Sequence, residues 1–157
     1  MAKPVVMSYS RLFSTDQARA FDSVLPTALP ELFHRRYGPI PPIRAVEDQD
    51  GVWGTVGQTR TIHLADGGSM CEELTRVERP ASFAYTITGL TGPMKPLAAL
   101  ILGSWTFDED AGQTRVTWQW TITPKSALAA PIMPIFRRLW RGYASRTFDQ
   151  IGVLVRS

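Results

Sequence analysis

Two charged side chains that could take part in binding or catalysis are expected to face each other in a predicted hairpin. Arg60 and Glu73 lie on strand-like segments that flank Asp66-Gly67, a strong two-residue turn signal. With these two residues at the centre of the turn, Arg60 lies opposite Glu73, on the face that also carries apolar side chains. Two ions on such a face are costly unless they pair. The pair would either fix the sheet as an internal salt bridge or anchor the polar head group of a ligand.

General acid–base chemistry has three weak candidates, Glu73, Tyr85 and His34. They could transfer protons only if the fold brings them together in one pocket. Glu72 and Glu73 are adjacent in a strand, so their side chains point to opposite faces and cannot form a carboxylate pair. We therefore predict no defined set of catalytic residues.

Metal binding is not expected. The two histidines, His34 and His63, lie on different predicted elements and lack the spacing of metal ligands. The sequence predicts no metal ion and no other cofactor.

The single cysteine, Cys71, is relevant to the chemical reactivity of the protein and to its expected location in the cell. It has no evident activating partner and is expected to be a small buried side chain opposite Ile62. The same register assigns Met70 and Glu72 to the outer face of the sheet. A lone cysteine forms no internal disulfide, and no apolar leader follows Met1, so we expect a cytoplasmic location.

Large aromatic side chains occupy alternate positions along the later strands, so they would point to the same face of the sheet and form its inner face. Buried Tyr and Trp side chains need partners for their polar tips, and the walls of a ligand cavity can supply them. Core packing is the alternative, which we favour for Phe83 and Phe107. The residues expected to contact a ligand are Arg60, Glu73, Tyr85, Ile87, Trp105, Phe107, Trp118, Trp120, Phe136, Trp140 and Tyr143.

The elements that must position these residues follow from hydrophobic periodicity. Apolar residues recur at steps of three and four from Pro131 to Val155, which predicts one long amphipathic helix. Ser14 is the expected cap of a first short helix that Pro26 ends, and Leu29–Phe33 is a second one. Strands are expected at Val5–Phe13, Ile43–Glu47, Thr59–Leu64, Ser69–Glu78, Ser82–Thr88, Leu100–Asp108 and Thr114–Thr123.

A long helix that follows antiparallel strands must bury its apolar stripe against a curved sheet. We expect an α+β fold in one domain, residues 1–157: a curved antiparallel sheet of about seven strands wraps around the long C-terminal helix, and two short helices follow the first strand. The loop Gly89–Pro96 is a candidate lid at the cavity mouth. No apolar run reaches 18 residues, so no transmembrane segment is expected.

Basic residues are concentrated unevenly, although the net charge is only +3. A solvated helix face explains them, and attraction to an anionic partner such as RNA or lipid head groups is the alternative. We expect no DNA partner, and we leave open whether the protein is a monomer or a dimer. The residues concerned are Arg35, Arg36, Arg137, Arg138, Arg141, Arg146 and Arg156.

Short motifs occur in an order and spacing that resemble one family. They are residues 56–60, 66–68, 73–74, Pro80 with 83–85, 105–107, 114–118 and 140–143. The chain resembles the START-like (SRPBCC) superfamily with its helix-grip fold, and within it the polyketide cyclase/dehydrase-like branch found widely in bacteria. The resemblance implies a cavity between sheet and long helix for lipids, polyketides or other hydrophobic molecules. Arg60 and Glu73 match recurrent polar positions of the branch, but the resemblance supplies no catalytic set.

Three functions are consistent with these observations. The first is binding, with transport or sequestration, of a hydrophobic small molecule such as a lipid, polyketide or aromatic compound. The second is an enzyme of the polyketide cyclase/dehydrase type, in which pocket residues polarise a substrate with several carbonyls. The third is a protein- or RNA-interaction module that uses the basic helix face.

Overall fold

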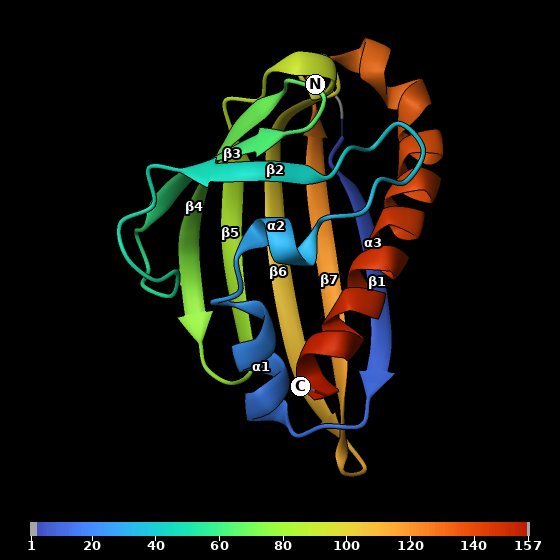
Figure 1. The fold of residues 1–157 in the computed structure, drawn as a ribbon. Helices are drawn as coiled ribbons and strands as arrows, with labels where there is room; N and C mark the ends of the chain where they lie inside the picture. Colours follow the sequence, from blue (N-terminus) through green and yellow to red (C-terminus); the bar gives the residue numbers. More distant parts are fainter. Residues whose placement is uncertain (1–2, 157) are drawn as a thin grey trace.

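A seven-stranded antiparallel sheet curves around one long helix in the computed structural model, which describes residues 3–156 (Figure 1). The order across the sheet is β1-β7-β6-β5-β4-β3-β2. This arrangement confirms the predicted helix-grip fold. The strands are β1 (Val5–Phe13), β2 (Ile43–Glu47), β3 (Thr59–Leu64), β4 (Ser69–Glu78), β5 (Ser82–Thr88), β6 (Ala98–Asp110) and β7 (Gln113–Pro124).

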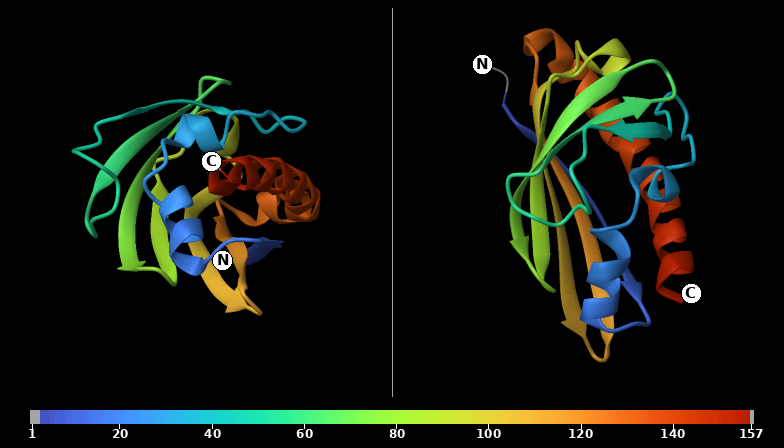
Figure 2. Two further views of the ribbon diagram at one scale, coloured as in Figure 1. Left: turned by 60° about the horizontal axis from the view of Figure 1, so that its bottom comes forward. Right: turned by 60° about the vertical axis from the view of Figure 1, so that its left-hand side comes forward.

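The helices lie on the concave side of the sheet (Figure 2). Within residues 3–156, none combines the length and the apolar character needed to cross a membrane. They are α1 (Gln17–Val24), α2 (Leu29–Leu32) and α3 (Met133–Arg156), with short 3₁₀ helices η1 (Gly92–Met94) and η2 (Ala127–Ile132).

Helix α1 is capped by Asp16, whose carboxylate accepts a hydrogen bond of 2.8 Å from the backbone N–H of Arg19. The predicted cap, Ser14, is wrong. Its hydroxyl lies before the helix and accepts a hydrogen bond of 3.0 Å from the Gln113 side chain. The helix ends at Val24, shortly before Pro26.

Helix α3 begins at Met133, slightly later than predicted, because the preceding residues form η2. Pro131 lies within this 3₁₀ helix, a frequent lead-in to an α-helix. The apolar stripe of α3 then faces the sheet, and the indole rings of Trp140 and Trp118 approach to 4.5 Å between centroids. The helix is thereby fixed against the concave face.

The β3–β4 hairpin has a three-residue loop, not the expected two-residue turn. Leu64 N–H donates to the Gly68 carbonyl at 2.8 Å, so these two residues close the loop. Gly67 has φ of 90°, in the left-handed region that glycine tolerates. Asp66 stabilises the loop by accepting a hydrogen bond of 2.8 Å from Gly68 N–H. An Asp-Gly pair fits this loop as well as the shorter one.

The longer loop shifts the pairing of β4 by one residue. Arg60 lies opposite Glu72, so the predicted Arg60–Glu73 pair is wrong. Because side chains alternate along a strand, this shift exchanges the two faces of β4. Met70 and Glu72 are buried on the concave side, whereas Cys71 and Glu73 are exposed. The prediction of a buried Cys71 is therefore also wrong.

The inner faces of β5, β6 and β7 carry the expected apolar side chains. Trp105 and Trp118 stack at 5.3 Å between ring centroids across β6 and β7, and both are buried. Trp120 is half-buried at the next inward position of β7. This aromatic layer forms the floor on which α3 packs.

Candidate ligand-binding site

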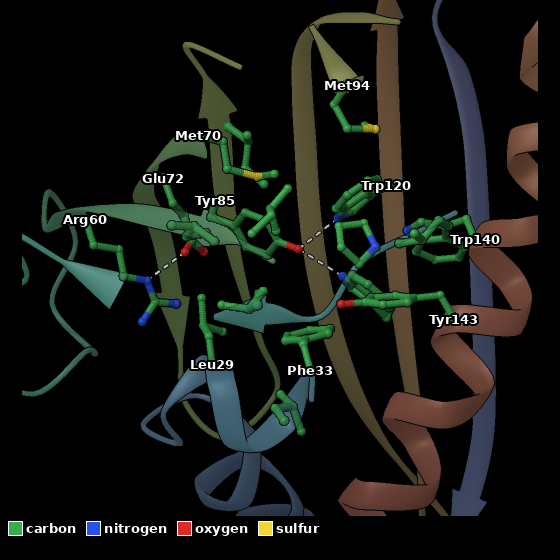
Figure 3. Close-up of a pocket in the computed structure, with 18 of the residues that line it drawn as sticks. Leu29, Phe33, Arg60, Met70, Glu72, Tyr85, Met94, Trp120, Trp140 and Tyr143 are labelled. Atoms are coloured by element: carbon green, nitrogen blue, oxygen red, sulfur yellow. Dashed lines mark hydrogen bonds and ion pairs between the residues drawn. The ribbon is translucent and has the colours of Figure 1, made fainter. Parts of the chain in front are cut away.

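A cavity of about 180 Å³ lies between the concave face of the sheet and helix α3. Strands β3 to β7 form one wall and α3 forms the opposite wall (Figure 3). Residues of α1, α2, η1 and the segment that follows η1 also line the cavity. Most of its lining is aromatic or aliphatic. An apolar cavity of about 150 Å³ holds a benzene molecule, so this volume suits a small ring compound.

Most of the residues predicted to contact a ligand meet in this cavity. The residues in its lining are Arg60, Tyr85, Ile87, Trp105, Trp118, Trp120, Phe136, Trp140 and Tyr143. They come from five separate elements, β3, β5, β6, β7 and α3, so only the folded chain brings them together.

Three predicted residues lie elsewhere. Glu73 is exposed on the outer face of β4 because of the register shift. Phe107 is buried outside the cavity lining, where its ring packs against Phe21 at 5.3 Å between centroids. His34 is exposed, and its Nε2 lies 3.2 Å from the side-chain oxygen of Gln150.

Several lining residues escaped prediction. Met70 and Glu72 alternate with exposed residues along β4 and point inward, as Leu74 does. The two-residue turn predicted from the sequence assigns them to the outer face instead. Trp53 comes from an irregular loop, and Phe33 follows α2. Loop side chains have no periodicity, so no sequence signal indicated that these two face the cavity.

A buried ion pair forms the polar end of the cavity. Arg60 Nε donates a hydrogen bond of 2.7 Å to Glu72 Oε1, and these side chains are only 4% and 5% exposed. The Arg60 guanidinium also donates to the Gln49 side chain at 3.1 Å and lies 3.8 Å from the ring centroid of Trp53. Burial raises the pKa of the Glu72 carboxyl, and the charge of Arg60 opposes that shift.

Tyr85 forms the centre of a second polar group. Its hydroxyl oxygen accepts hydrogen bonds from Trp118 Nε1–H at 2.9 Å and from Trp120 Nε1–H at 3.0 Å (Figure 3). Burial raises the pKa of Tyr85, and the nearby charge of Glu72 raises it further, so the phenol stays protonated.

Helix α3 contributes Trp140 and Tyr143 to the opposite wall. The Tyr143 hydroxyl points from the helix into the cavity (Figure 3). Burial raises the pKa of Tyr143, which keeps this phenol neutral as well. Trp140 Nε1–H is buried and has no hydrogen-bond partner among the described residues.

The lining can bind and orient a ligand more readily than it can transfer protons. Its carboxylates are Glu72, which Arg60 holds, and Asp66, which belongs to the exposed hairpin loop. No histidine is among the described residues that line the cavity. Across residues 3–156, His, Cys, Asp and Glu side chains form no group of three suited to a metal ion.

A family model described as "Polyketide cyclase / dehydrase and lipid transport" matches residues 7–154. The chain belongs to this family. Membership confirms the predicted family and supports hydrophobic-ligand binding in general terms. No curated protein matches the chain significantly in sequence.

Solved structures share the fold of this polyketide cyclase/dehydrase family member at low sequence identity. Ara h 8.0201 is 15% identical with a TM-score of 0.68, covering 98% of this chain and 99% of that one. The major latex-like protein 151 of Panax ginseng is 14% identical with a TM-score of 0.71, covering 96% and 97%. Protein Ms6760 of Mycobacterium smegmatis is 20% identical with a TM-score of 0.65, covering 95% and 89%.

The basic residues of α3 lie outside the cavity. Arg137, Arg138 and Arg141 are exposed, and no acidic side chain of the described residues lies within ion-pair distance of them. Arg146 is exposed and lies 5.4 Å from the ring centroid of Tyr37. These positions fit a solvated face, and the interaction hypothesis remains a prediction.

Proposed function

We propose that the protein binds a hydrophobic small molecule in the cavity between sheet and α3, for transport or sequestration. The proposal rests on the cavity of about 180 Å³, which is lined mostly by aromatic and aliphatic side chains and has a buried ion pair at one end. Such a lining stabilises an apolar ligand by removing its surface from water. The family supports the same class of function.

The Arg60–Glu72 pair bounds one end of the cavity, and aromatic and aliphatic side chains line most of the rest. The apolar body of the ligand would lie among these side chains, which include Trp105 and Phe136. Pro93 and Met94 belong to the loop after β5 and line the cavity, which makes this loop the candidate entrance. The ligand would pass there because loops open more easily than paired strands.

Binding fits the lining better than cyclase/dehydrase catalysis does. Proton abstraction requires a base within hydrogen-bond distance of the substrate. Glu72 is the buried carboxylate of the wall, and its hydrogen bond to Arg60 opposes that role. Turnover that is lost in Glu72→Gln but kept in Glu73→Gln would favour the enzyme alternative instead.

The cavity can be tested with tetralin, a two-ring hydrocarbon without polar atoms. Ile87→Trp fills the cavity from β5, whereas Leu102→Trp adds the same bulk at a position of β6 that is 45% exposed. Binding is followed by ligand-observed NMR, and thermal melting verifies that each variant folds. We expect the wild type and Leu102→Trp to bind tetralin and folded Ile87→Trp to lose binding.

A wild type that does not bind tetralin, or a folded Ile87→Trp that binds it as well as Leu102→Trp does, would refute the proposed function. Native mass spectrometry of the purified protein complements this test. A stoichiometric hydrophobic compound that leaves on denaturation would support the proposal and identify the ligand class.

A further inference from the structure

Several hydrogen-bond donors that face the cavity have no acceptor among the described residues. A phenol oxygen accepts at most two hydrogen bonds, and Tyr85 already accepts two, from Trp118 and Trp120. What remains on Tyr85 is its own O–H, and no described residue accepts it. Toward a ligand, Tyr85 is therefore a donor only.

Two further donors come from the opposite wall. Trp140 and Tyr143 are one helical turn apart on α3, so they share a face. They are 1% and 6% exposed. Neither Trp140 Nε1–H nor the Tyr143 hydroxyl bonds to a described residue. Figure 3 shows the Tyr143 hydroxyl pointing toward the side of the cavity where the Tyr85 hydroxyl lies.

Buried donors without partners are unfavourable, because folding removes their water and supplies nothing in return. Here they surround a cavity instead of lying in a filled core. The ion pair does not satisfy these donors, because Glu72 accepts its hydrogen bond from Arg60. A ligand that brings an acceptor atom satisfies donors that the protein leaves free.

The charge of that ligand follows from the same contacts. Among the described residues that line the cavity, Arg60 is the one cationic side chain, and the carboxylate of Glu72 already neutralises it. An anionic ligand would therefore find no free positive charge on the wall. Both phenols are neutral, so they suit an uncharged acceptor.

We propose that the ligand is a neutral ring compound with a carbonyl oxygen, which accepts hydrogen bonds from Tyr85 and Tyr143 between the sheet and α3. This inference rests on the proposed function, because it needs the cavity to be a binding site. Tyr143 is the donor to substitute, since its hydroxyl, unlike that of Tyr85, makes no hydrogen bond to another described residue. Trp140 Nε1–H is a third donor beside it.

The test compares 1-tetralone with tetralin, which share a two-ring skeleton and differ in the carbonyl. We measure the dissociation constants of both for the wild type, Tyr143→Phe and Tyr37→Phe. Tyr37 is the matched control because it lies outside the cavity lining. We expect the wild type to bind 1-tetralone about 3–10-fold more tightly than tetralin, as one or two net hydrogen bonds allow.

Tyr143→Phe should reduce this preference without weakening tetralin binding, because one of the two phenol donors is lost while Tyr85 remains, and Tyr37→Phe should keep the full preference. A measurement on the wild type needs no variant: the carbonyl carbon of bound ¹³C-labelled 1-tetralone should resonate downfield of its position in cyclohexane, where the carbonyl accepts no hydrogen bond. Trp140→Phe, which keeps a ring at the same place, should cause a smaller loss than Tyr143→Phe.

The outcomes separate the two proposals. If both compounds bind wild type equally, or folded Tyr143→Phe keeps the preference, the carbonyl inference is wrong while the binding function stands. If neither compound binds, both proposals fail. A bound carbonyl resonance at the cyclohexane position would also overturn the inference.

Discussion

Arg60 and Glu72 form an ion pair on the concave face of the sheet, with 2.7 Å between Arg60 Nε and Glu72 Oε1. The centroid of the Trp53 ring lies 3.8 Å from Cζ of the Arg60 guanidinium. Both charges are removed from water, so each depends on the other. The neighbouring Glu73 points into solvent from the same strand. Two adjacent glutamates therefore have opposite environments, and this contrast can be measured.

Glu72→Gln should lower the free energy of unfolding by about 3 kcal/mol, because it leaves the buried Arg60 without a counter-charge. Glu73→Gln should change it by less than about 0.5 kcal/mol, as is usual for a solvated side chain. Urea denaturation at pH 7 measures both. Equal effects of the two substitutions would contradict the register of β4.

Cys71 provides a chemical test of the same register. Its thiol is exposed, so it should react with a thiol reagent such as DTNB in the folded protein. In a Cys71→Ser background, Met70→Cys places the thiol on the buried face and should react only on unfolding. A protected Cys71, or a Met70→Cys thiol that reacts at the same rate, would refute the assigned faces.

The buried phenol of Tyr143 should lower the free energy of unfolding in alkaline solution. Its folded-state pKa is raised by burial, so unfolding lets the phenol ionise above its ordinary pKa of about 10. The stabilisation is present below that pH and is lost as pH rises above it, by up to about 1.4 kcal/mol per pH unit for each such group.

Tyr143→Phe removes this group, so its free energy of unfolding should fall less steeply above pH 10 than that of the wild type. Chemical denaturation between pH 8 and pH 11.5 measures both curves, and the values at pH 8 give the baseline difference. Parallel curves over the whole range would show that Tyr143 ionises equally in both states.

Gly103 lies opposite Tyr85 on β6, and its missing side chain leaves room for the phenol ring. A Cβ at this position would overlap the ring, so Gly103→Ala should displace Tyr85 from Trp118 and Trp120. We expect a loss of about 1–3 kcal/mol in unfolding free energy, typical of overpacking, with a changed tryptophan emission. Ser104→Ala, the next residue along β6, should leave the emission as in wild type.

The sequence predicted most of the fold because periodicity decides which element forms and which face it buries. Strand β7 alternates cleanly, so Trp118 and Trp120 were assigned to the inner face without knowledge of their partners. The long stripe of α3 placed Trp140 and Tyr143 in the same way. These assignments needed only local pattern.

The candidate site was predicted less completely, for two physical reasons. Asp66-Gly67 fits a two-residue and a three-residue loop, and a difference of one residue exchanges every side chain of β4 between the faces. The sequence therefore offered Glu73 where the structure has Glu72. Trp53 and Phe33 come from irregular segments, whose positions depend on tertiary contacts alone.

The pairing of β1 with β7 has a consequence for how the chain acquires its shape. Val5 lies opposite Ile122, so the two paired strands are more than a hundred residues apart in the chain. Contacts of such long range slow folding, because a long loop must close before they form. Helix α3 follows β7 and is therefore synthesised after all the strands of the sheet. Until it is available, the aromatic face that will become the cavity floor stays uncovered, and the nascent chain is at its most prone to aggregate.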